Sequence, residues 1–110
     1  MNKQRRKEIR TVISGLEEIK ANISIDDEVI AEKLNDLCAD VYSIMSDEEE
    51  YRDNMPENLQ YSSKYESADE ACDNLYNAID EIENAAESVD DKDEVIKSIN
   101  DAIGYLNEAI

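Results

Sequence analysis

The chain has 110 residues, 41% of them apolar, and a net charge of −18 from 29 acidic and 11 basic side chains. This length suits one domain with a modest core, and the regular spacing of the apolar residues argues against disorder. So large an excess of negative charge keeps a protein soluble and excludes nucleic acid as an ordinary partner.

Two amphipathic helices are predicted before the only proline, Pro56. The first spans about residues 2–21, where apolar residues recur on one helix face: Ile9, Val12, Ile13, Leu16 and Ile19. The second spans about 27–54 and follows capping residues at Ser24 and Asp26. Its apolar stripe, at heptad positions a, d and e, is offset by four residues from that of the first helix. This offset requires a break or kink near residues 23–26.

A corner at residues 55–65 follows the second helix. Proline lacks the backbone N–H that a helix interior needs and disfavours the helical conformation of the preceding residue. The helix should therefore end at Asn54 or Met55. Four consecutive acids precede the corner, and Asp53 and Glu57 follow them. This part of the chain is therefore its most acidic region.

Two further helices are predicted after the corner, at about 66–88 and 92–109. The third helix has alanines along heptad position d, which allow a close approach of another helix, and a row of outward carboxylates: Asp69, Asp73, Asp80, Glu83 and Glu87. The fourth carries the stripe Val95, Ile96, Ile99, Ile103, Leu106 and Ile110. A shift of three residues between these stripes mirrors the earlier break.

The pattern predicts a single all-α domain over residues 1–110 with coiled-coil-like packing. Both an antiparallel helical hairpin with kinked arms and a four-helix bundle satisfy it. Three apolar positions per heptad need more cover than one neighbouring helix provides, which favours the bundle or a homodimer. Gly15, inside the first helix, marks an expected close helix contact.

The charge is unevenly distributed. Residues 1–20 carry six bases and three acids, whereas residues 21–110 carry five bases and 26 acids. We therefore expect the basic end to dock on acids of its own chain or of a second copy. The residues expected to meet are Arg5, Arg6 and Arg10 with Asp91, Asp93 and Glu94.

No enzymatic chemistry is predicted. The chain has no histidine, no glycine-rich phosphate loop and no serine in a nucleophile-elbow context. Two cysteines, Cys38 and Cys72, occupy helical core positions without the spacing of a zinc site. We expect no catalytic, cofactor-binding or metal-binding residues. Since there is no membrane-length apolar run and no signal-peptide core, we expect a cytoplasmic protein.

The dense carboxylates predict a binding function instead. Carboxylates three and four residues apart on a helix lie about 5–6 Å from one another, similar to neighbouring phosphates of a nucleic acid. Antiparallel pairing of the second and third helices would gather the corner acids, and tyrosines can anchor an interface. Glu48 occupies a core position, which suggests that the core ends before the corner. The predicted partner-binding residues are Asp47, Glu48, Glu49, Glu50, Tyr51, Asp53, Glu57, Tyr61, Tyr65, Asp69, Glu70 and Asp73.

One stretch carries a family resemblance. Residues 53–60, with 47–51 before them and 68–79 after them, resemble small acidic helical proteins of phages and mobile elements of Gram-positive gut bacteria. The basic opening, residues 2–7, is similar too. The size and charge also resemble those of anti-CRISPR proteins that act as DNA mimics. This resemblance implies an inhibitor of a type II (Cas9-type) effector nuclease that occupies the PAM-reading cleft in a bacterial host cell.

The sequence therefore predicts a non-enzymatic acidic inhibitor that binds a basic nucleic-acid-binding protein and blocks its DNA site. The alternative is a structural or adaptor coiled-coil protein that acts through helix–helix association. Competition with DNA and sensitivity to salt distinguish the first function from the second.

Overall fold

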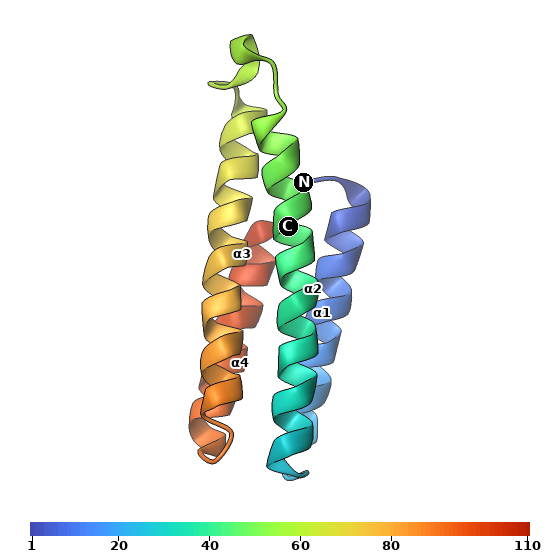
Figure 1. Ribbon diagram of the computed structural model, residues 1–110, viewed down its shortest axis with the longest axis vertical. Helices are drawn as coiled ribbons and strands as arrows, with labels where there is room; N and C mark the ends of the chain where they lie inside the picture. The colour runs from blue at the N-terminus through green and yellow to red at the C-terminus, as the bar shows by residue number, and fades with distance from the viewer.

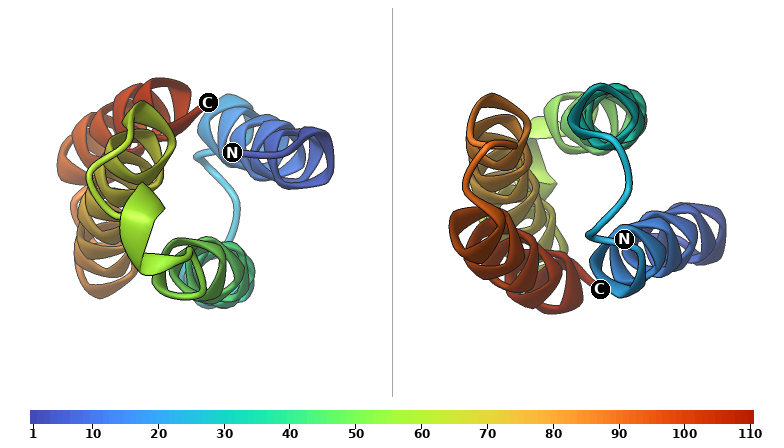
Figure 2. Two further views of the ribbon diagram at one scale, coloured as in Figure 1. Left: turned by 90° about the horizontal axis from the view of Figure 1, so that it is seen from above. Right: turned by 90° about the horizontal axis from the view of Figure 1, so that it is seen from below.

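Four antiparallel α-helices make up the computed structural model, which describes residues 1–110. The elements are α1 (Lys3–Ala21), α2 (Asp27–Asp53), the short 3-10 helix η1 (Glu57–Leu59), α3 (Ser63–Glu87) and α4 (Lys92–Ala109). Helices that follow one another in the chain pack side by side, and α4 also packs against α1 (Figures 1 and 2). The all-α prediction is confirmed, and the chain adopts the compact bundle rather than the kinked hairpin.

Side chains cap the start of every α-helix. The capping residues are Asn2, Asp26, Ser62 and Asp91. Each accepts a hydrogen bond from a backbone N–H of the first turn, which has no partner within the helix. The Ser62 cap begins α3 three residues before the expected start at residue 66. Apolar periodicity missed this first turn because its residues, 63–65, precede the buried stripe.

The predicted break between the first two helices is a reversal of chain direction. The N–H of Asn22 donates to the carbonyl oxygens of Glu18 and Ile19, each at 3.1 Å, and ends α1. Five residues, 22–26, then turn the chain back into α2. The connection between α3 and α4 lies at the same end of the bundle (Figure 1). The two breaks therefore lie side by side, as the antiparallel pairing predicts.

The core runs through all four helices and is made of the predicted apolar stripes. Leu16, Leu34, Leu75 and Ile99 are fully buried, one on each helix. Burial of such a side chain contributes about 1.5–3 kcal/mol. Small residues of α4 also face the interior although the apolar pattern did not select them: Ser98, Ala102 and Ala109. Gly15 marks a close contact, as expected, since a Cβ atom there would lie 3.0 Å from Cδ2 of Leu37.

The hairpin of α2 and α3 is longer than the two helices that cover it. α2 and α3 have 27 and 25 residues, against 19 in α1 and 18 in α4. At 1.5 Å per residue, α2 is about 40 Å long and α1 about 28 Å. Both chain ends lie beside the hairpin, and its far end projects beyond them (Figure 1). We call this projecting segment, residues 49–66, the tip.

The molecule measures 51 × 20 × 17 Å along its principal axes. None of its helices combines the length and the apolar character that a membrane span requires.

Candidate functional site

The expected acidic residues gather at the tip and on the adjoining turns of α2 and α3. Arg52 and Asp69, whose side chains meet, show that the end of α2 lies beside the start of α3. Eight of the nine expected carboxylates reach the surface, and of these only Glu49 is half-buried. The exposed ones are Asp47, Glu50, Asp53, Glu57, Asp69, Glu70 and Asp73.

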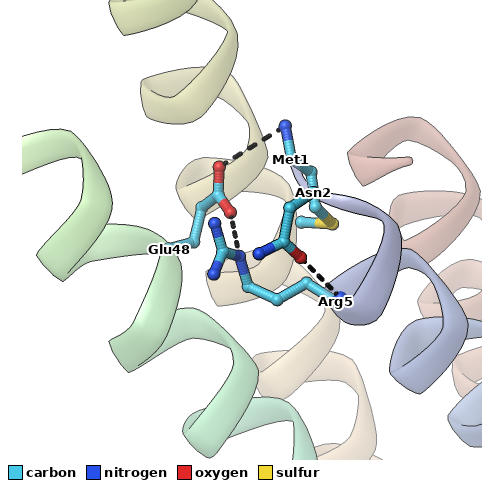
Figure 3. Close-up of polar contacts among 4 residues, drawn as sticks. All are labelled: Met1, Asn2, Arg5 and Glu48. Atoms are coloured by element: carbon cyan, nitrogen blue, oxygen red, sulfur yellow. Dashed lines mark hydrogen bonds and ion pairs between the residues drawn. The ribbon is translucent and has the colours of Figure 1, made fainter.

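Glu48, the ninth of these acids, is fully buried. Its Oε2 accepts a hydrogen bond of 2.6 Å from Nε of Arg5, and its Oε1 lies 3.7 Å from the amino group of Met1 (Figure 3). Oε1 itself accepts no hydrogen bond. The prediction that Glu48 contributes to partner binding is therefore wrong. Its heptad position places it in the interior, and Arg5 supplies the opposite charge that burial requires.

Arg5 also corrects the expected docking of the basic end. Because α1 runs antiparallel to α2, its first turn lies beside Glu48 near the far end of α2, away from Asp91 (Figure 1). Asn2 holds this turn by accepting a 2.8 Å hydrogen bond from the N–H of Arg5. The start of α4 instead contacts the start of α2, where Lys92 pairs with Asp27.

The apolar core ends before the corner, as the position of Glu48 suggests. Its last buried members at this end of the hairpin are Ile44 on α2 and Leu75 on α3. Three further buried residues of α3 lie outside this contiguous core: Ala68, Ala71 and Cys72. Beyond Ile44, the interior side of α2 therefore carries the charged pair of Glu48 with Arg5 in place of a large apolar side chain.

Arg52 neutralises part of the acidic surface. Its Nε donates to Asp53 at 2.9 Å and its Nη1 donates to Asp69 at 3.0 Å, which ties α2 to α3. The hydrogen bond to Asp53 raises the pKa of Arg52 above its ordinary value although burial opposes the change, so the guanidinium remains charged. Five of the predicted carboxylates are exposed and have no ion pair: Asp47, Glu50, Glu57, Glu70 and Asp73.

The three predicted tyrosines differ in exposure. Tyr61, in the loop after η1, is 92% exposed, and Tyr51 on α2 is 42% exposed. Tyr65 is half-buried in the first turn of α3. The guanidinium carbon of Arg5 lies 5.6 Å from the ring centroid of Tyr51, within the range of a cation–π interaction. Tyr61 is therefore the most accessible of the three aromatic rings.

An open groove of about 550 Å³ runs between the end of α2 and the η1 segment. Its α2 side is formed by residues that share one helix face, at positions 47, 50, 51 and 54. The full lining is Arg5, Asp47, Glu50, Tyr51, Asn54, Met55, Pro56, Leu59 and Lys64. The groove thus combines an apolar surface with charges of both signs.

A pair of exposed aromatic residues outside the tip was not singled out from the sequence. Tyr42 and Tyr76 are 47% and 56% exposed on α2 and α3. The hydroxyl of Tyr42 donates to Oε1 of Glu83 at 3.2 Å and so links the two helices. Both tyrosines occupy heptad position b, beside the stripe, and that polar-face position is the signal that could have identified them.

The structure offers little for covalent or metal chemistry. No three histidine, cysteine or acidic side chains are arranged to hold a metal ion. Cys38 and Cys72 are free and buried, as predicted. Burial is the main reason that the pKa of each thiol is raised to about 11, which leaves almost no reactive thiolate at neutral pH.

No protein-family model, curated protein or solved structure matches this chain. Any function proposed for it therefore depends on its own charge and geometry.

Proposed function

We propose that this protein is a non-enzymatic acidic inhibitor that binds a basic nucleic-acid-binding protein and competes with DNA for its site. The observation that carries this proposal is the projecting tip. Between residues 47 and 73, the surface of α2, η1 and α3 carries many exposed carboxylates and only two basic side chains, Arg52 and Lys64. The tip itself projects beyond both chain ends, so a partner can approach it from several sides (Figure 1).

The carboxylates are held on rigid helices at spacings that suit a phosphate-binding surface. Asp69 and Asp73 are four residues apart on α3, and Asp47 and Glu50 are three apart on α2. Such pairs lie about 5–6 Å apart. Duplex DNA owes much of its affinity for proteins to its closely spaced phosphates, so a rigid acidic surface can compete for the same basic side chains without presenting a base. Preorganisation reduces the entropic cost of that binding.

The most concrete form of the proposal is an anti-CRISPR protein of a phage or mobile element that acts in the cytoplasm of a bacterial host. Its target would be a type II effector nuclease, and the acidic tip would occupy the cleft that reads the PAM duplex through arginines. The acidic tip supports this choice, as does the resemblance carried by residues 53–60, 47–51 and 68–79.

The adaptor alternative has less support. A coiled-coil adaptor needs an apolar helix face that is free for another chain. The stripes of α1 to α4 instead pack against one another within this bundle and form one core. The exposed large apolar residues outside the tip are few: Val29, the pair Tyr42 and Tyr76, and Tyr105.

A competition experiment tests the proposed function. The wild-type protein is titrated into a Cas9–guide RNA complex, and binding of a PAM-containing DNA duplex is measured by fluorescence anisotropy. We expect the protein to displace the DNA duplex. This inhibition should be weaker at high salt, because screening weakens charge steering. A variant with neutral side chains on the tip and on the adjoining turns should inhibit poorly. Its substitutions, at exposed acids without an ion pair, are Asp47→Asn, Glu50→Gln, Glu57→Gln and Asp73→Asn.

A control variant carries the same change in net charge at the other end of the bundle. Its substitutions, also at exposed acids without an ion pair, are Glu32→Gln, Asp36→Asn, Glu87→Gln and Asp90→Asn. This control should inhibit as well as the wild type does. Equal inhibition by all three proteins would exclude the tip as the mimic, and no inhibition by the wild type would remove the nuclease as the target.

A further inference from the structure

We propose that the groove between α2 and η1 receives an arginine side chain of the partner. The identity of that partner rests on the proposed function, whereas the preference for arginine follows from the groove itself. The bound side chain would lay its aliphatic stem on the apolar lining and place its guanidinium between Asp47 and Glu50. The groove would then be the specific contact within a surface that otherwise binds through charge density.

The apolar lining is accessible and unfilled by the chain itself. Tyr51 and Leu59 are each 42% exposed, and with Met55 and Pro56 they line the same groove. An arginine buries its methylene stem along apolar surface while its head remains polar. The groove therefore suits a side chain that is apolar along its length and charged at its end.

Charge complementarity selects a cation for that end. Asp47 and Glu50 are exposed, line the groove and make no ion pair. Arg5 also lines the groove, but it is already paired at 2.6 Å with the buried carboxylate of Glu48, which also lies 3.7 Å from the N-terminal amino group. Lys64 is the one basic lining residue without such a counterion. The two free carboxylates therefore outweigh the one free ammonium.

The position of Tyr51 favours arginine over lysine. Its ring already lies near the guanidinium of Arg5, at 5.6 Å from the ring centroid. Tyr51 is 42% exposed, so a planar cation from solvent can reach part of its surface. A guanidinium stacks on an aromatic ring and also binds carboxylates through a fork of N–H donors, which an ammonium group cannot do.

A peptide titration tests this inference without the nuclease. The probe is acetyl-Gly-Arg-Leu-Gly-amide, compared with the same peptide carrying neutral citrulline in place of arginine and with a lysine version. Backbone amide shifts of the protein are followed by NMR at low salt. We expect the arginine peptide to shift residues of the groove, with affinity in the order arginine, lysine, citrulline. Equal binding of the citrulline peptide, or shifts spread evenly over all acidic helix faces, would overturn the inference.

Single substitutions in the groove should change its affinity for the arginine peptide in opposite directions. Glu50→Gln and Leu59→Ser should each weaken arginine-peptide binding about two- to fivefold, the range of a modest cation contact. Lys64→Gln should strengthen it, because a repelling ammonium is removed. Glu87→Gln, an exposed acid of α3 away from the groove, is the control and should change it little. Weakening by Lys64→Gln, or equal weakening by Glu87→Gln, would contradict an arginine site.

The two proposals can fail separately. If the groove binds arginine but the protein does not inhibit the nuclease, the arginine site stands and the nuclease is excluded as the target. Inhibition that depends on the tip acids, together with no preference for the arginine peptide, would keep the proposed function and remove the groove as its specific contact.

Discussion

Arg5 and Glu48 are 43 residues apart in the chain, yet they form an ion pair where the first turn of α1 meets the later part of α2. The glutamate side chain is fully buried and the arginine side chain is 13% exposed. Burial of this ion pair costs desolvation energy for both groups, so its net contribution to stability is small. Removal of one partner costs much more, because the other charge is then buried without a counterion.

Arg5→Ala should destabilise the protein by about 3–5 kcal/mol, because it leaves the buried carboxylate of Glu48 without its main counterion. The free energy of unfolding in urea, followed by circular dichroism, measures the loss. Arg6→Ala removes an exposed base from the next position and should cost no more than about 0.5 kcal/mol.

The double variant Arg5→Met, Glu48→Met should recover most of the stability lost in Arg5→Ala. Apolar replacement of both members of a buried ion pair is often neutral or stabilising. If the double variant is as unstable as Arg5→Ala in the same urea experiment, the pair contributes more than charge neutralisation.

The two glycines should respond differently to alanine. Nothing lies within 4 Å of a Cβ atom at Gly104, in the interior of α4, so Gly104→Ala should add about 0.5–1 kcal/mol from helix propensity. At Gly15 the new methyl group would meet Leu37 at 3.0 and 3.2 Å, and that side chain must move. Gly15→Ala should therefore raise the melting temperature less than Gly104→Ala does, or lower it, when the two variants are melted under the same conditions. A larger gain at Gly15 would contradict the close contact.

Glu81 should make stability depend on pH. Burial, then repulsion from Asp101, raises the pKa of this carboxyl above 4.5, and Lys97 opposes the shift. The native state therefore binds the proton more readily than the unfolded chain does, and this group's contribution to stability falls as pH rises from 4.5 through the native pKa.

Glu81→Gln should raise the melting temperature at neutral pH and flatten its dependence on pH above 4.5. Glu87→Gln removes the same charge from an exposed position of α3 and serves as the control for the general relief of acidic repulsion. Identical pH profiles for the two variants would mean that Glu81 has no special environment.

The two cysteines should be inert until the bundle opens. Their thiol pKa values of about 11 arise mainly from burial, and the carboxylate of Glu83 adds to the shift at Cys38, whose sulfur lies 3.9 Å away. Ellman's reagent at mildly alkaline pH should react slowly with native protein and quickly with both thiols in urea. Fast reaction of one thiol in the native protein would reveal local opening around that helix.

Apolar periodicity predicted the helices and nearly all of the core because those depend on local spacing. Ile9, Leu16, Ile99 and Leu106 were placed in the interior by the pattern alone, and they are buried. The end of α2 near Pro56 also followed from backbone chemistry, since proline cannot continue a helix. The choice between the bundle and the hairpin could not be predicted in this way, because a shift in the apolar frame marks a break in the helix without giving the angle of that break.

The candidate site could be predicted only in part. Exposed acids such as Asp47 and Glu57 follow from their polar positions, but the burial of Glu48 depends on Arg5, which lies on another helix. The pairing of Arg52 with Asp69 across the tip likewise needed the relative placement of α2 and α3. Long-range charge pairs of this kind leave no local periodicity to recognise.

The order in which the bundle assembles follows from the placement of α1. α1 also forms a hairpin with its neighbour α2, but it packs against α2 and α4 less extensively than α3 packs against the same two helices. α1 must join α4 from the opposite end of the sequence, through contacts such as the 2.7 Å hydrogen bond from Lys20 to Asn100. We therefore expect α1 to dock last during folding and to exchange its amide hydrogens first in the native protein.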